Sequence, residues 1–390
     1  MKIFFTGFFL LNLLTVIAQE NQETYLFAED IYNKIEKDTM SWKYQIGATE
    51  FSFIGKYADV ISAWDKNGVR KHKVEEKDSL YFINCRKEDA RDYVLKQADS
   101  FDILIINEAH HVAQHRMFTK SLLQELYNKG YRYLGLEALA DTGINNRKFP
   151  VMESGYYTKE PEFGNLLSEA LKIGFIAFGY EASAGKNGKE REIEQAENIE
   201  KFIKENQEGK VLIHCGYAHA YENDYPAWGK AMAGRLKENL NIDPLTIDQT
   251  MFPERSDEEN NHLFLKMNTT GKSIVLLEEN GRPFNGFAVN NQTDIVVIPP
   301  QTVFEDRRPH WIKEGKHPYS IPRNKLSKDE QLLFLAYREN EFDNNGVPAD
   351  LIEVLPGESP SMLYLEKGKY DIIIKNRNYN IIEKYKIVIE

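Results

Sequence analysis

The chain has 390 residues, of which 42% are hydrophobic and 28% charged, a composition typical of globular proteins, and its length allows two or three domains. A formal net charge of −11 argues against a nucleic-acid partner, because phosphate binding requires a basic face. The chain has only two cysteines, Cys85 and Cys215. We expect two free thiols and a fold stabilised by a large core rather than by disulfides.

The first residues have the pattern of an export signal. Lys2 supplies a positive charge, residues 3–17 are uncharged and largely apolar, and Val16-Ile-Ala18 precedes a cleavage point. The run is shorter than the roughly 20 apolar residues of a membrane helix. We therefore predict a removed signal peptide over residues 1–18 and a secreted or periplasmic mature chain without a membrane span. No cysteine precedes Cys85, so a lipid anchor is not expected there.

Strand-like and helix-like segments then alternate along the chain. Helical spacing in 21–37, 49–64 and 86–97 predicts a cover layer. After this layer, apolar runs predict strands over residues 101–106, 132–136, 174–178, 210–214 and 242–248. Amphipathic segments between them predict helices over residues 112–128, 162–172, 189–206 and 226–239. Parallel strands need helix-length returns. The pattern therefore predicts a three-layer α/β domain over residues 19–310, with a mainly parallel sheet flanked by helices.

The sequence pattern changes after residue 250, where short β-rich runs are separated by turns. We interpret residues 270–310 as edge strands and loops of the first domain. Residues 311–340 are expected to be a connector that contains a helix over 327–338. Residues 341–390 alternate like a small antiparallel β module, which we expect to fold on its own core and to be dispensable for chemistry.

Polar side chains occupy the ends of the predicted core strands. Because the carboxyl ends of parallel strands meet at one edge of the sheet, these residues should surround one cleft although they are far apart in sequence. The candidates are Glu108, His110, His111, Glu137, Tyr180, Glu181, His214 and His219.

Glu108 and His110 lie two residues apart, and strand residues at that spacing share a face. A carboxylate beside an imidazole can orient it as a general base, or both can bind one cation. The alternative is that Glu108 caps the next helix and His110 is a solvated turn residue. His115 follows one helical turn later and is expected to face solvent or to serve as an additional ligand.

The remaining candidates have structural alternatives of their own. A lone carboxylate such as Glu137 is costly at the end of an apolar strand unless it is paired. Arg191 begins a predicted helix and can hold an oxyanion, whereas most helix-surface arginines are solvated. His214 has the alternative of a satisfied core histidine. His219 follows a bend that starts at Gly216.

Four short motifs resemble the erythromycin esterase / ChaN / Tiki superfamily. They occur in order over roughly residues 100–220: Asn107-Glu-Ala-His110, Gly135-Leu-Glu137, Arg191-Glu-Ile-Glu-Gln-Ala-Glu-Asn198 and Gly216-Tyr-Ala-His219. The chain departs from the family at Asn107, where the family has glycine, and at Tyr217-Ala218. The resemblance implies the α/β fold and the site residues Glu108, His110, Glu137, Arg191 and His219. Its members include esterases, metal-dependent proteases and haem-binding lipoproteins.

Three functions follow as expectations. The first is an exported hydrolase of ester or peptide bonds, acting on a small molecule or peptide, in which His110 activates water. A divalent metal (Zn, Mn or Co) held by Glu108, His110 and His219 could perform the activation instead. The second is a haem- or iron-binding uptake protein that uses His111, His115 or Tyr180, and the third is a non-catalytic ligand-binding domain. The sequence lacks a Gly-x-Ser-x-Gly elbow and a phosphate-binding glycine loop.

Overall fold

A six-stranded sheet forms the centre of the α/β domain, and every neighbouring pair of its strands is parallel. The computed structural model describes residues 23–69, 76–287, 291–357 and 362–390, so the predicted signal peptide lies outside the described residues. The strands follow the order β10 (Ile295–Val296), β8 (Leu245–Asp248), β2 (Ile103–Glu108), β5 (Lys210–Gly216), β3 (Tyr131–Leu136) and β4 (Ile176–Gly179). The predicted α/β fold class is confirmed.

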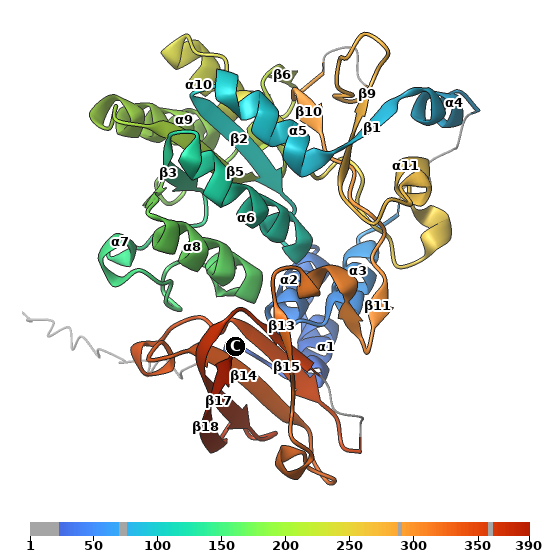
Figure 1. Cartoon of the computed structure of the whole chain (residues 1–390), viewed down its shortest axis with the longest axis vertical. Helices are drawn as coiled ribbons and strands as arrows, with labels where there is room; N and C mark the ends of the chain where they lie inside the picture. The colour runs from blue at the N-terminus through green and yellow to red at the C-terminus, as the bar shows by residue number, and fades with distance from the viewer. Residues whose placement is uncertain (1–22, 70–75, 288–290, 358–361) are drawn as a thin grey trace, which may run out of the picture.

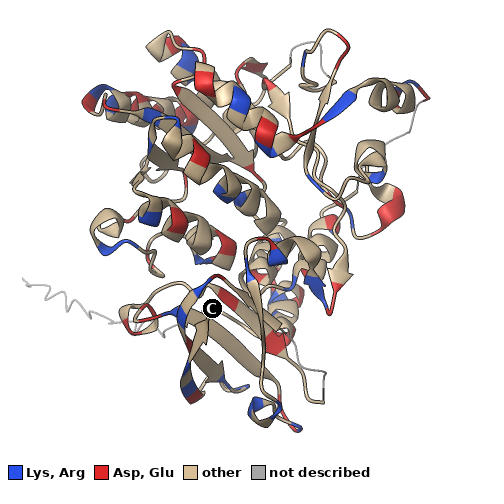
Figure 2. Ribbon diagram, in the orientation of Figure 1, with Lys and Arg blue, Asp and Glu red and all other residues tan. Residues whose placement is uncertain are grey.

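Helices cover both faces of this sheet and produce three layers (Figure 1). Alternate residues of one strand enter different cores, because successive strand side chains point to opposite faces. Leu104 and Ile106 of β2 pack with α5 (Ala90–Gln97), α6 (Ala113–Asn128) and α8 (Pro161–Ile173). Ile103 and Ile105 pack with α9 (Gly188–Glu205) and α10 (Met232–Leu240). In Figure 2, β2 carries almost no charge whereas the helices carry acidic and basic residues on their outer sides.

The N-terminal elements differ from the predicted helices in two places. The helix expected over 49–64 is divided into α2 (Lys43–Phe53) and α3 (Tyr57–Asp65), because Gly55 adopts a left-handed conformation with φ of +66°. The helix expected from residue 86 begins at Ala90. Residues Arg86–Asp89 instead form β1, which pairs antiparallel with β9 (Ile274–Leu277), and Asp89 then caps α5.

The C-terminal region is a four-stranded antiparallel sheet, as predicted, but it begins earlier in the chain. Its order is β15 (Asp350–Val354), β14 (Leu332–Arg338), β17 (Gly368–Lys375) and β18 (Ile381–Ile389). A two-stranded sheet of β13 (His317–Ser320) and β16 (Met362–Leu365) accompanies it. The helix predicted over 327–338 is wrong, because the apolar run at its end is strand β14. That strand lies within the segment interpreted as a connector.

This C-terminal sheet shares its core with the N-terminal helices. Leu333, Leu335 and Ile373 pack with residues of α2, α3 and α1 (Ala28–Lys37), while Leu332 and Phe334 point into a second cluster made by the β module itself. In Figure 1 the blue N-terminal helices lie directly beside the red sheet. We predicted that the module folds on its own core, but it also packs against the N-terminal helices. Deleting residues 341–390 would expose the apolar faces of α1–α3.

Within the described residues, no helix combines the length and the apolar character needed to cross a bilayer. Cys85 and Cys215 are both buried and unpaired, as expected from the sequence. Pro226 and its neighbours form a hairpin of β6 (Asp224–Tyr225) and β7 (Gly229–Lys230) before α10 starts, so the helix predicted from residue 226 begins six residues later.

Candidate functional site

The five main candidate residues lie at the carboxyl edge of three neighbouring strands. Glu108 is the last residue of β2, Glu137 follows the end of β3, and His219 lies in the short helical turn after β5. The register places Glu108 beside Gly216 and Leu136 beside His214. Arg191 enters from the first turn of α9. The structure therefore brings together residues that are up to 111 positions apart, as the strand-end pattern predicted.

Glu108 is the centre of a buried ion-pair network. Arg116 of α6 donates from Nε and Nη2 to both oxygens of the Glu108 carboxylate, at 2.6 and 2.7 Å. His110 donates from Nδ1 and His214 from Nε2, each at 2.9 Å. Burial alone would raise the pKa of Glu108, but Arg116 and these hydrogen bonds hold that pKa well below its usual range. Glu108 is therefore ionised, and both of its carboxylate oxygens accept hydrogen bonds from protein side chains.

His110 is held on three sides and open on one. Its Nδ1 is bound to Glu108, its ring stacks on Tyr157 with centroids 3.9 Å apart, and the edge of Tyr217 approaches at 5.3 Å. Its side chain is 18% exposed. Because an ionised carboxylate only accepts hydrogen bonds, the proton of a neutral His110 resides on Nδ1, and Nε2 carries the free lone pair.

Gly216 allows His110 and Glu137 to approach each other. A Cβ at this position would lie 2.5 Å from Nε2 of His110 and 3.2 Å from Oε2 of Glu137. Any side chain would therefore displace the imidazole. The backbone N–H of Gly216 also donates to Oε2 of Glu137 at 2.6 Å. Glycine at this strand end therefore lets the His110 ring and the Glu137 carboxylate both pack against the same point of the backbone.

Glu137 pairs with Arg191 in a second network that reaches solvent. Arg191 donates from Nη2 to Glu137 and forms a bidentate pair with Glu181 of the loop after β4. Burial would raise the pKa of Glu137, but His219, His110 and Arg191 together lower it to about 2. The side chains of Arg191 and Glu181 remain 27% and 39% exposed. This network is charged at neutral pH and accessible to a ligand.

His219 links Arg191 to a buried carboxylate. Its Nδ1 donates to Oε2 of Glu192 at 2.9 Å, and its Nε2 accepts from Nη1 of Arg191, also at 2.9 Å. Trp228 of the β6–β7 hairpin stacks on its ring. Burial would lower the pKa of His219, but the carboxylates of Glu137 and Glu192 outweigh burial and raise it. The ring is fixed in position and orients Arg191.

The weaker candidates are buried, with the exception of Glu181. His214 is a core histidine that supports Glu108, which was the structural alternative for this residue. His111 stacks on Trp64 at 3.7 Å between ring centroids. The expectation that His115 faces solvent is wrong, because it is buried and its Nδ1 accepts from the Ala109 N–H at 3.0 Å. Tyr180 is 1% exposed and donates to the His214 carbonyl.

Several contributing residues were not identified from the sequence. Arg116 and Glu192 lie on segments with amphipathic helical patterns, and Glu160 lies in the irregular polar segment before one; charged residues in such places are usually solvated. Arg116 is completely buried and joins Glu108 to Glu160, the N-cap residue of α8. Glu192 could have been found, because it occupies the acidic position next to Arg191 in the motif quoted above. Tyr157 comes from the polar segment after β3, whose side chains offered no periodic signal.

The predicted metal ligands do not form a metal site. Among the described residues, no group of three His, Cys, Asp or Glu side chains is arranged to hold an ion. Glu108 has both oxygens bound by Arg116, and the guanidinium of Arg191 lies against Nε2 of His219. A divalent cation would therefore face two fixed positive charges. The donor set does not fit a metal bound by Glu108, His110 and His219.

The residues named as haem ligands are poorly placed to reach an iron. A side chain that binds haem iron as an axial ligand must project from the pocket wall and reach the metal. His111, His115 and Tyr180 are 5%, 7% and 1% exposed and each makes a hydrogen bond inside the protein. His110, at 18% exposure, is more accessible than these three residues.

No family model and no curated protein matches the sequence. Among solved structures, the type III effector HopBA1 is 12% identical with a TM-score of 0.36, over 56% of this chain and 98% of that one. ChaN of Campylobacter jejuni, described with cofacial haem binding, is 12% identical with a TM-score of 0.28, over 54% of this chain and 92% of that one. A structure described as bacterial protein toxins is 15% identical with a TM-score of 0.31, over 55% of this chain and 48% of that one. The esterase and Tiki branches of the predicted superfamily are not among these three, so that membership stays a prediction.

Proposed function

We propose that the protein is a hydrolase of ester or peptide bonds in which His110 is the general base. The observation that supports this most directly is the orientation of His110. Glu108 fixes its Nδ1 at 2.9 Å, and its Nε2 lies close to Gly216, on the side of Glu137. A base that is oriented by a carboxylate and keeps a free lone pair is the arrangement that activates water.

The reaction follows from this arrangement. His110 Nε2 accepts a proton from water while the water oxygen attacks the carbonyl carbon of the substrate. The tetrahedral intermediate collapses when the bond to the leaving oxygen or nitrogen breaks, and the proton on Nε2 passes to the leaving group. Glu108 stabilises the imidazolium that forms between these steps, and it stays ionised because Arg116 lowers its pKa against the effect of burial. No cofactor is required for the atoms to balance.

Arg191 supplies the positive charge for the oxyanion. A guanidinium has five N–H groups. One is directed to His219, one to Glu137 and two to Glu181, which leaves one N–H on Nη1 for a ligand. Glu137 and His219 hold the guanidinium in place from the protein side. A fixed donor of this kind stabilises developing negative charge without reorganisation.

The test is hydrolysis of ester and peptide panels by the purified protein. Replacing His110 with alanine should lower kcat by about 10²–10⁴-fold, which is the usual contribution of a general base. His317→Ala is the matched control, because His317 is exposed on β13 of the C-terminal region. Circular dichroism should be unchanged in both variants. Absence of turnover in the wild-type protein, together with a saturable Soret shift on haem addition, would replace the hydrolase with a haem-binding function.

A further inference from the structure

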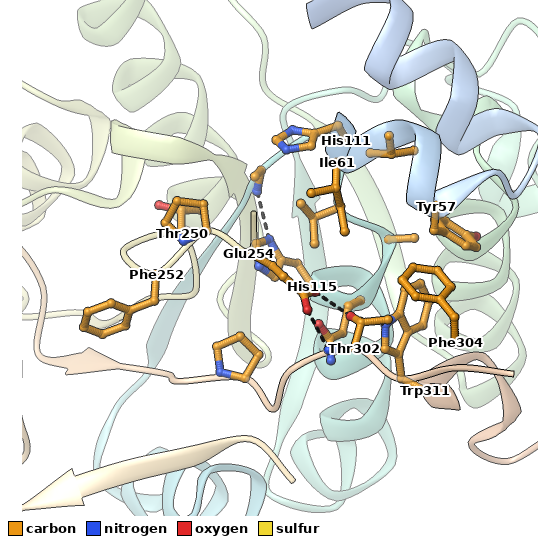
Figure 3. Close-up of a pocket in the computed structure, with 17 residues that line it drawn as sticks. Tyr57, Ile61, His111, His115, Thr250, Phe252, Glu254, Thr302, Phe304 and Trp311 are labelled. Atoms are coloured by element: carbon orange, nitrogen blue, oxygen red, sulfur yellow. Dashed lines mark hydrogen bonds between the residues drawn. The ribbon is translucent and has the colours of Figure 1, made fainter. Parts of the chain in front are cut away.

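A pocket lies beside the candidate site and is lined mainly by apolar and aromatic side chains (Figure 3). Ala109 and His111, the sequence neighbours of His110, form part of its wall. The other walls come from α3, from the start of α6, and from two loops around residues 250–254 and 299–311. The hydrolase proposal assigns no role to this pocket.

Four aromatic rings line the pocket. Tyr57 and Trp311 contact each other edge to face with centroids 4.9 Å apart, and Phe252 and Phe304 also line the space. Tyr57, Trp311 and Phe252 are buried, whereas Phe304 is 38% exposed. The face of an aromatic ring carries partial negative charge and attracts cations. A lining of this kind accommodates an apolar group and also favours a positive charge over an anion.

Glu254 adds a carboxylate to this lining. It accepts hydrogen bonds from the backbone N–H of Thr302 at 2.7 Å and from the Thr302 hydroxyl, which in turn accepts from Nε1 of Trp311 at 3.2 Å. The two Thr302 bonds are the dashed lines at Glu254 in Figure 3. Burial raises the pKa of Glu254, and no cation opposes that effect. No lysine or arginine forms an ion pair with Glu254 within the described part of the chain.

The other titratable groups of the pocket are neutral histidines. Burial lowers the pKa of His115 to about 3 and holds the pKa of His111 well below its usual range. No lysine or arginine lines the pocket among the described residues. The lining therefore combines one carboxylate with four aromatic rings and has no compensating positive charge. A partly buried carboxylate without a cationic partner is costly, and a ligand cation would offset that cost.

We propose that this pocket, with a cavity volume of about 60 Å³, binds a small organic cation, namely a protonated amine on a short apolar chain. The ammonium group would lie at Glu254 and the apolar chain against Tyr57 and Trp311. The ammonium donates to the lone pairs of the Glu254 carboxylate that Thr302 leaves unused, and the rings add cation–π attraction. This site goes beyond the proposed hydrolase, because binding to it requires no turnover and none of the residues that act in hydrolysis.

The experiment compares three ligands of the same shape with the wild-type protein. The probes are propylamine, which is protonated at neutral pH, the neutral propan-1-ol and the anionic propanoate, each titrated by calorimetry and by tryptophan fluorescence. We expect the amine to bind saturably and at least about 10-fold more tightly than the alcohol, because hydrogen bonds to charged groups are the stronger ones. The carboxylate should bind most weakly. Equal affinity for amine and alcohol, or no saturable amine binding, overturns the proposal.

Two variants locate the site. Glu254→Gln should weaken amine binding about 10-fold or more and leave alcohol binding within about threefold, because the amide keeps the shape and loses the charge. Glu305→Gln is the matched control, since Glu305 is exposed on the neighbouring β11 (Phe304–Glu305) and pairs with Lys313. Phe304→Ala should weaken both ligands without affecting folding, because this ring is partly exposed. If Glu254→Gln leaves amine affinity unchanged, Glu254 only clamps the Thr302 loop and the proposal fails.

Discussion

The two carboxylates at strand ends, Glu108 and Glu137, each form an ion pair with an arginine, but the two ion pairs differ in burial. Each lies at the end of a core strand, and each pairs with an arginine from a helix later in the chain. The side chains of Glu108 and Arg116 are 2% and 0% exposed, whereas those of Glu137 and Arg191 are 8% and 27% exposed. The first pair is closed to solvent, and the second continues to the exposed Glu181.

In the proposed hydrolase, this difference separates residues that position His110 from residues that bind the substrate. A buried pair cannot exchange partners, because removal of either charge leaves the other uncompensated. The Glu108–Arg116 pair therefore fixes the orientation of His110 and His214. The Glu137–Arg191 pair is partly hydrated, and Glu181 can give way to a substrate oxygen at moderate cost. Identical residue types at equivalent strand ends thus have different roles because their burial differs.

The largest effect should come from breaking the buried pair. Arg116→Met keeps much of the side-chain volume but leaves Glu108 and Glu160 without their cation, so we expect a loss of about 3–5 kcal/mol in the free energy of unfolding. Urea denaturation measures this loss. Arg282→Met is the control, because Arg282 is 61% exposed and solvent screens its ion pair with Glu278. Similar destabilisation by the two substitutions would contradict the proposed contrast.

Arg191→Met should affect catalysis strongly and stability only slightly. We expect kcat for the hydrolytic reaction to fall by about 10²–10³-fold, as for the loss of one oxyanion donor. The free energy of unfolding should fall by only about 1 kcal/mol, because partly exposed ion pairs contribute little. Steady-state kinetics and urea denaturation of the same preparation give both values. A variant that keeps its kcat would remove Arg191 from the reaction.

Glu137 should make stability depend on acid pH. Its pKa of about 2 in the folded protein lies below the ordinary value of 4.5. Its contribution is therefore complete above about pH 5 and is lost as the pH falls through about 2, and it amounts to about 3 kcal/mol. Glu137→Gln should flatten the pH dependence of the free energy of unfolding between pH 5 and 2 by about this amount. An unchanged slope would show that Glu137 is not ion-paired in solution.

Gly216→Ala should reduce stability less than the loss of the buried Glu108–Arg116 pair. The added Cβ would lie 2.4 Å from Cε1 of His110, so the ring must leave its stacked position on Tyr157. We expect a loss of about 1–3 kcal/mol from overpacking and a decrease in kcat. Gly143→Ala is the control, because its Cβ would meet only ordinary contacts of 3.4 Å. Histidine resonances in NMR spectra would report whether the His110 ring has moved.

The sequence predicts the strand ends of the site better than its helical partners. Glu108, Glu137 and His219 could be located because apolar strands end abruptly at or before them. Arg116 could not, because its neighbours on α6 include polar residues and no helical period distinguishes a buried arginine from a solvated one. Pairing partners are set by tertiary contacts between distant segments, and a single sequence does not record those contacts.

Strand β14 illustrates how far the fold can be predicted from the sequence. Residues 332–337 form a continuous apolar run after a polar segment that begins with Ser327, which resembles the start of a helix. Ser327 does accept from the N–H groups of Asp329 and Glu330, but only as a turn. The run then extends as a strand because both of its faces are buried in different clusters. Periodicity alone does not distinguish such a strand from a buried helix.

The pocket beside the site also has a consequence for the order of folding during synthesis. Its walls come from four segments, and the first and last of them, at Tyr57 and Trp311, are more than half the chain apart. Contacts of such long sequence separation form late, since loop closure must precede them. All strands of the central sheet except β10 precede residue 250, so they can assemble while the ribosome still holds the C-terminal third. Ligand affinity at this pocket therefore appears only when the chain is nearly complete, which makes amine binding a reporter of finished folding.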